Sequence, residues 1–164
     1  MLKSAQQFLV FSFIHLSYGA DWVIDGDIEC KEIIHGFGEF SFLLQEAIIR
    51  FYEQDNGQNA IVDKDDDLLF GKHVLTDSFG HFNVKGHDYE NICCLEPYLQ
   101  IDHLCYTPNI GPLLMGCYYR TRIDLQPRPD RQNVHIILGI QSAKQITENE
   151  KDLKIVTTMF CPEK

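Results

Sequence analysis

The chain is poor in basic residues and has no long apolar run. Its 164 residues include 14 lysines and arginines against 24 aspartates and glutamates, a formal net charge of −10 at pH 7. Such a surface disfavours nucleic acid and anionic lipid as partners. The apolar stretches are too short to cross a bilayer. We therefore expect neither a nucleic-acid-binding protein nor a transmembrane span.

Catalytic and metal-binding signatures are also missing. The sequence has no Gly-x-Ser-x-Gly motif, no recognisable Cys/His catalytic arrangement and no Asn-x-Ser/Thr glycosylation site. His73, His81, His87 and His103 are spread over three predicted elements, so we expect no metal site and no cofactor. His103 lies on an apolar face, which predicts a hydrogen-bonded core histidine. We expect a protein that is not an enzyme.

An acidic run at 63–67 resembles the start of a calcium-binding loop. It lacks the glycine that such a loop needs at its sixth position, where Leu68 stands, and the glutamate at its twelfth, where Val74 stands. The pattern favours a solvated acidic turn over a cation site. Asp66 and Asp67 are expected to brace that turn.

Residues 1–20 have the form of a secretory signal peptide. A single lysine precedes an apolar run at 8–16, and small residues follow it. We expect cleavage after Gly19 or Ala20, which leaves a mature domain at 21–164. The protein is therefore predicted to be secreted, to the extracellular region or the cell surface.

All six cysteines lie in the predicted mature domain: Cys30, Cys93, Cys94, Cys105, Cys117 and Cys161. An even count after an export signal predicts a disulfide framework. Cys105 and Cys117 face inward on neighbouring predicted strands and flank a short loop, so we predict that they pair. Cys30 is expected to pair with Cys93, Cys94 or Cys161. The adjacent Cys93 and Cys94 are not expected to bond each other, because the ring would be strained.

Alternating apolar and polar residues predict short β-strands along the mature chain. The predicted strands are 22–30, 46–53, 68–76, 82–88, 97–105, 117–125, 134–140 and 153–161. A turn is expected at 77–80, and 144–151 reads as a loop or short helical turn. Seven or eight such strands predict an all-β antiparallel sandwich.

Two segments do not fit this frame cleanly. Residues 33–45 are apolar and aromatic without a clear period, which is compatible with an edge strand, with an exposed patch for a partner, or with a segment absent from the mature protein. Four arginines with two intervening aspartates give a local net charge of +2: Arg120, Arg122, Arg128 and Arg131. A solvated strand face is favoured there, and a site for an anionic ligand or lipid headgroup is a weak candidate.

The order of motifs resembles the transthyretin-like family of nematode secreted proteins. The matching segments are Trp22–Cys30, Ala47–Tyr52, Asp66–Leu69, Thr76–Phe82, Glu96–Cys105, Cys117–Leu125 and Leu153–Phe160. The family's Gly-Lys-Pro turn after the first cysteine is absent, and 33–45 stands in its place. Cys93 and Cys94 do not belong to the motif, and 126–150 does not align.

The resemblance implies a transthyretin-type (Ig-like, prealbumin-like) sandwich that acts at or near cell surfaces as a binding or signalling protein. Its partner would be an extracellular protein or a cell-surface ligand, and no catalytic residue carries over. The alternative is a transthyretin-type small-ligand carrier or a 5-hydroxyisourate hydrolase. The Tyr-Arg-Gly-Ser signature of that hydrolase family is not found here.

Overall fold

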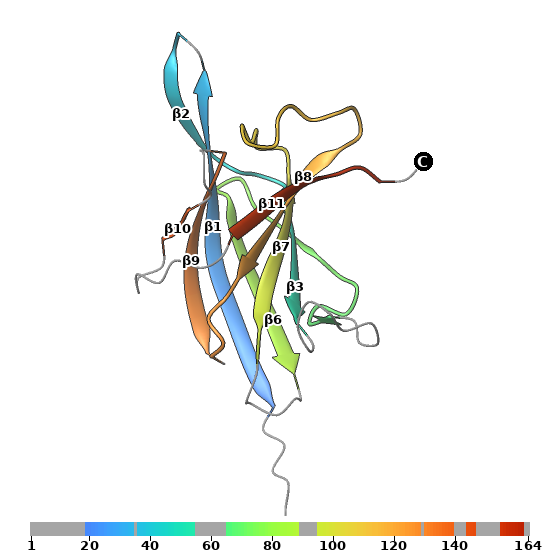
Figure 1. The fold of residues 1–164 in the computed structure, drawn as a ribbon. Coiled ribbons are helices and arrows are strands. Elements are labelled where there is room, and N and C mark those ends of the chain that lie inside the picture. Colours follow the sequence, from blue (N-terminus) through green and yellow to red (C-terminus); the bar gives the residue numbers. More distant parts are fainter. Residues whose placement is uncertain are drawn as a thin grey trace, which may run out of the picture.

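A computed structural model shows an all-β, sandwich-like fold of two sheets, A and B (Figure 1). The structure describes residues 19–34, 36–54, 65–88, 95–128, 130–139, 144–146 and 155–162. This confirms the predicted all-β class and its division into two layers.

Sheet A is organised around β1 (Ala20–Ile34), a strand of 15 residues. One edge of β1 pairs in parallel with β9 (Arg131–Leu138), and β10 (Lys144–Ile146) pairs with the far side of β9. The other edge pairs antiparallel first with β6 (His81–Asp88) and then with β2 (Gly38–Leu43). Because β1 is longer than its partners, its last third and β2 extend beyond the sandwich as a hairpin (Figure 1).

Sheet B has the order β11-β8-β7-β3, with every pair antiparallel. Its main strands are β3 (Ile48–Glu53), β7 (Pro97–His103), β8 (Tyr118–Asp124) and β11 (Ile155–Phe160). Two short strands, β4 (Asp66–Asp67) and β5 (Val74–Leu75), pair with the outer edge of β3. Pro97 opens β7, as predicted for a residue that has no N–H to donate.

The core lies between the alternating inner positions of the two sheets. The Trp22 indole meets the Phe51 ring edge-on, with 6.1 Å between the ring centroids. Gly26 makes room for Phe82 and Val134, because a Cβ there would lie 2.6 Å from side-chain atoms of both. The glycine on the buried face of β1 is therefore a packing requirement.

Several predicted elements need correction. The strand predicted at 68–76 is instead a turn at 68–71 between β4 and β5, because both Asp67 oxygens accept backbone hydrogen bonds, from Leu69 at 2.9 Å and Gly71 at 2.7 Å. Residues 144–146 form a strand where a loop or helical turn was expected. The sandwich was expected to be antiparallel, yet β1 and β9 run parallel.

The predicted turn at 77–80 is present. The Gly80 N–H donates to the Asp77 carbonyl at 3.0 Å, and the Asp77 carboxylate accepts from the N–H groups of Phe79 and His81. These two backbone hydrogen bonds hold the pKa of Asp77 below its ordinary value. Gly80 has a φ of 68°, and a Cβ there would lie 2.5 Å from the Ile28 carbonyl oxygen.

The predicted disulfide pairing is wrong. Cys30 of β1 bonds Cys105, which follows β7, and Cys117 bonds Cys161. The β7–β8 register would place Cys105 opposite Cys117, but strand pairing ends at His103 and Tyr119. The β8–β11 register extends Cys117 equally well to Cys161, and those two Cα atoms are 4.3 Å apart. Cys93 and Cys94 lie outside the described residues.

The start of β1 bears on the predicted signal-peptide boundary. Ala20 is the first residue of the strand, pairs with Asp88 and is buried. Cleavage after Gly19 keeps this side chain in the sheet, whereas cleavage after Ala20 removes it. Residues 1–18 lie outside the described part of the chain.

Gly139, which follows β9, packs closely against the backbone of β1 and the Cys30–Cys105 bond. A Cβ there would lie 2.3 Å from the Lys31 carbonyl oxygen and 2.8 Å from Cys105 Sγ. Gly111 has almost the same φ, 90° against 92°, and no described atom within 4 Å of such a Cβ. We expect Gly111→Ala to cost about 1 kcal/mol through backbone strain and Gly139→Ala about 3 kcal/mol through added overlap. Urea unfolding measures both, and equal costs would show that the close packing is absent.

Candidate functional site

The β1–β2 hairpin is amphipathic and projects from the sandwich. Its inner face continues the buried face of β1 and carries the exposed Ile34, Phe40 and Phe42, with Glu32 opposite Phe40. Its outer face is mixed: Lys31 Nζ lies 3.9 Å from both Glu29 and Glu39, and the exposed Ile33 and Leu43 lie on the same face. No strand of sheet B within the described residues covers the inner face. The hairpin therefore presents core-like side chains without a second layer.

The β7–β8 connection adds a second group of exposed apolar residues at the same end. It contains no charged residue from 104 to 116, and it exposes Leu104, Tyr106, Ile110, Leu114 and Met115. Internal hydrogen bonds hold the loop in shape, including Gly111 N to Thr107 O at 3.1 Å and Tyr119 Oη to Gly111 O at 2.5 Å. The exposed side chains thus stand on an ordered loop.

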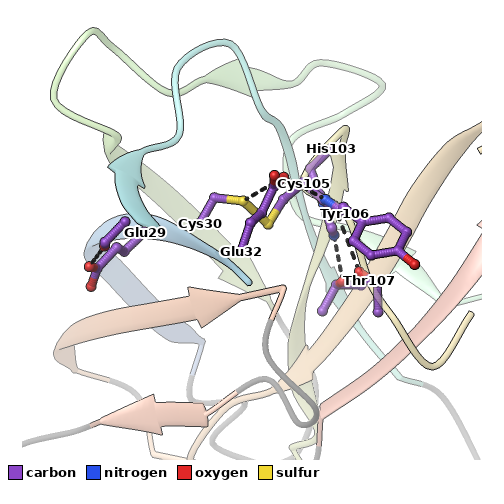
Figure 2. Close-up of a disulfide and its surroundings, with 9 residues drawn as sticks. Glu29, Cys30, Glu32, His103, Cys105, Tyr106 and Thr107 are labelled. Carbon is purple, nitrogen blue, oxygen red and sulfur yellow. Dashed lines mark hydrogen bonds between the residues drawn. A yellow bond between two sulfur atoms is a disulfide. The ribbon is translucent and has the colours of Figure 1, made fainter. Parts of the chain in front are cut away.

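The Cys30–Cys105 disulfide joins the bases of the hairpin and this loop (Figure 2). Glu32 accepts a hydrogen bond from the Tyr106 N–H at 3.2 Å, which ties the two segments a second time. The Glu32 carboxylate also lies 3.7 Å from Cys30 Sγ. That approach is a contact only, because a disulfide sulfur carries no hydrogen. Cys30, Glu32 and Cys105 are consequently not a metal site, although their ligand atoms converge.

We call the hairpin residues 29–43 and the loop residues 104–116 together the apolar end. Sixteen large hydrophobic side chains are exposed among the described residues, and eleven of them belong to the apolar end. Single exposed hydrophobic residues are ordinary on protein surfaces, but a concentration of this kind marks an interaction site. Within the segment 33–45, whose role the sequence left open, residues 33–34 end β1 and residues 38–43 form the edge strand β2 with such a surface.

The outer face of sheet B carries arginines between aromatic rings. Arg120 forms a two-pronged ion pair with Asp102, at 2.7 and 3.0 Å, and Arg50 contacts the same carboxylate. Arg122 pairs with Asp124 at 2.7 Å, and its guanidinium carbon lies 3.7 Å from the centroid of the Tyr98 ring. Burial alone would raise the pKa of Asp102, but the hydrogen bonds from Arg120 and Arg50 outweigh it and hold that pKa below its usual value.

The four arginines singled out in the sequence do not form one site. Arg120 and Arg122 belong to this face of sheet B, where carboxylates already engage them. Arg128 is exposed in the β8–β9 connection. Arg131 begins β9 in sheet A, and its guanidinium lies 3.9 Å from Asp25. Proximity in sequence was misleading because β8 and β9 belong to different sheets.

His103 is a core histidine, as predicted. It is 3% exposed, and its Nε2 lies 2.8 Å from Thr121 Oγ1, which in turn lies 2.9 Å from Thr157 Oγ1. Nδ1 lies near the backbone of Cys105 without a partner of good hydrogen-bond geometry among the described residues. Burial lowers the pKa of His103 to about 4, against the opposing effect of the Asp102 carboxylate. The ring is therefore neutral in the folded protein at neutral pH.

The acidic run before β4 makes turn and side-chain contacts. Asp67 braces the 68–71 turn, as expected, and Asp66 pairs with Glu53 in the β3–β4 ladder. The Tyr98 hydroxyl donates to Asp65 at 2.5 Å. Burial and this carboxylate raise the pKa of Tyr98. Residues 63 and 64, the start of the calcium-like run, lie outside the described residues.

Sequence reasoning missed Arg50 and the loop at 104–116. The pairing of β3 with β7, needed to place Arg50 beside Asp102, involves a separation of 52 residues. The signal for the loop was present in its composition, since a connection of 13 residues without any charge is unusual for a surface segment.

Asp102 provides a test of the arginine face. Asp102→Asn leaves Arg50 and Arg120 without their shared anion in a buried position, and we expect a loss of about 3 kcal/mol in the free energy of unfolding at pH 7. Asp124→Asn is the matched control, because that carboxylate pairs with Arg122 while about a third exposed, and it should cost under about 1 kcal/mol. Chemical denaturation compares the two variants. A loss for Asp102→Asn no larger than the control's would refute the buried ion-pair assignment.

His103 predicts a specific pH dependence. Its pKa is lowered on folding, so the unfolded chain takes up the proton first, and the stability from the neutral ring is lost as pH falls from about 6.5 to about 4. Over that window we expect a loss of about 3 kcal/mol that a His103→Gln variant does not show. The exposed His73→Gln is the control. Parallel pH–stability curves for wild type and His103→Gln would contradict this role.

The comparisons with known proteins assign no family to this fold and site. No protein-family model matches the chain, and no curated protein matches it. The described residues contain no helix of the length and apolar character needed to span a membrane. The functional assignment therefore depends on the geometry described above.

Proposed function

We propose that this protein is a secreted, transthyretin-like binding or signalling module, without catalytic activity, that recognises an extracellular protein through the apolar end. The observation that carries the proposal is the concentration of eleven exposed hydrophobic side chains on two segments joined by the Cys30–Cys105 disulfide. Two disulfides in a chain that opens with a signal-peptide pattern support an oxidising, extracellular setting.

The hairpin offers two means of recognition. Its inner face supplies aromatic anchors, which dominate the energetics of many protein interfaces. The outer edge of β2 pairs with no other strand among the described residues, so its backbone groups can accept an added strand from a partner. Together they suit an extended segment that pairs with β2 and covers Phe40 and Phe42.

Charge favours a protein partner over a lipid surface. The whole chain is acidic, and the hairpin from 29 to 43 carries three glutamates against one lysine. Anionic lipid surfaces attract basic segments, so this apolar end is poorly suited to them. An apolar partner surface bordered by basic residues would match both the hydrophobic area and the charge.

The proposal predicts that changes at the apolar end abolish recognition without unfolding the domain. The disulfide-bonded mature protein, carrying a proximity-labelling tag, would be applied to intact tissue of its source. We expect wild type to label a defined extracellular protein that Phe40→Ser/Phe42→Ser fails to label. Binding to that protein, once purified, should fall at least about tenfold for the double variant. Thermal unfolding of each variant checks that the sandwich persists.

Phe70→Ser is the matched control, because Phe70 is a highly exposed aromatic residue outside the apolar end. It should bind like wild type. Equal labelling by wild type and Phe40→Ser/Phe42→Ser would refute the proposed surface. Sedimentation of the isolated protein adds a second check, since a dimer lost in the double variant would assign the apolar end to self-association instead.

A further inference from the structure

The outer face of sheet A carries a symmetrical array of potential metal ligands. In the strand register, Asp27 of β1 lies directly opposite His81 of β6 on one side and His135 of β9 on the other. Asp25 of β1 likewise lies directly opposite Asn83 of β6 on one side and Asn133 of β9 on the other. Residues directly opposite in paired strands share a face of the sheet. Two carboxylates therefore run down the centre, flanked on both sides by imidazoles and amides.

The histidines already interact with these carboxylates. His81 Nε2 lies 2.8 Å from Asp25 Oδ1, and Asn83 donates to Asp25 Oδ2 at 2.9 Å. His135 Nδ1 bonds to Asp27, and its Nε2 lies 3.5 Å from Glu29 Oε2. The hydrogen bond from His81 is the main reason that the pKa of Asp25 lies below its ordinary value. Basic and acidic groups are thus gathered on one face.

The donor groups of this face, rather than its net charge, suit a cation. Asp25, Asp27 and Glu29 contribute three negative charges. The Arg131 guanidinium lies 3.9 Å from the Asp25 carboxylate. The Lys31 ammonium lies 3.9 Å from the Glu29 carboxylate. Lys85 is the third basic residue of this face. It follows Asn83 by two residues in β6 and pairs with Val23 of β1. Two neutral imidazoles with carboxylates form a donor set typical of Zn²⁺ and of related first-row ions.

We propose that the row formed by His81, Asp27 and His135 binds one divalent transition-metal ion, with Zn²⁺ as the best match to its donors. Within the described residues the donor atoms of this row do not yet converge. Binding requires His81 to turn from Asp25, and His135 from Glu29, toward an ion held over Asp27. Both histidine side chains are partly exposed, 48% and 36%, so this rotation displaces no core residue.

A zinc titration of the disulfide-bonded mature protein against a chromophoric chelator tests the proposal. We expect one ion per chain with micromolar or tighter affinity. Each of His81→Gln and His135→Gln should weaken it at least about tenfold, and the double variant should abolish it. Affinity should also fall as the pH is lowered, because metal ligation requires neutral imidazole.

His87→Gln and His73→Gln are the matched controls. His87 is on β6, the strand of His81, but lies outside the row, with its Nδ1 2.6 Å from Asp21. His73 is exposed and belongs to no strand of sheet A. Both variants should keep affinity within about twofold of wild type. Absence of binding at about 100 µM Zn²⁺, or equal losses for row and control variants, would overturn the proposal.

Imidazole NMR signals give a second readout that needs no variant. Added Zn²⁺ should shift the ring nitrogens of His81 and His135, because they would become ligands, and should leave those of His73, His87 and His103 in place. Shifts confined to other histidines would place the ion elsewhere and refute this site.

Discussion

The length of β1 is the constraint on which the rest of the structure depends. A single strand of 15 residues takes β9 along one edge and both β6 and β2 along the other, so it fixes the composition of sheet A. Its inner residues from Ala20 to Cys30 pack on sheet B, and Cys30 is bonded to Cys105 at the limit of that coverage. Beyond Cys30 the strand continues without a second layer. The hairpin part of the apolar end exists because β1 is longer than the core that it covers.

Much of the fold could be predicted from residue alternation alone. The strands at Trp22–Cys30, Pro97–Cys105 and Cys117–Leu125 showed their buried faces in sequence, because apolar residues occupy most of the alternate positions. The 68–76 segment could not be assigned in this way. Its apolar residues suggested a strand, but the hydrogen bonds from Leu69 and Gly71 to Asp67 make a turn there. Local side-chain bonding of this kind competes with strand formation and leaves no periodic signal.

Long-range pairing was the part that the sequence could not provide. Cys117 is opposite Cys105 by the β7–β8 register and opposite Cys161 by the β8–β11 register, so alternation could not rank the two partners. The Cys30–Cys105 bond across the sheets decides between the two partners, because it leaves Cys161 as the partner of Cys117. The same limitation hid the row at Asp27, since His81 and His135 are separated by 54 positions in the numbered sequence and meet only through β1.

The hairpin shows why these limits concern function as well as fold. The inner face of the hairpin changes where the second layer stops. Glu32 is the next inner residue after Cys30, and Ile34, Phe40 and Phe42 share that inner direction. In an isolated domain such side chains would cost solubility without contributing to stability. Ile34, Phe40 and Phe42 lie on the side that a second sheet would cover, with Glu32 among them. A partner that supplies the missing layer would cover these apolar side chains. It would lie beside the outer edge of β2, which pairs with no other strand among the described residues.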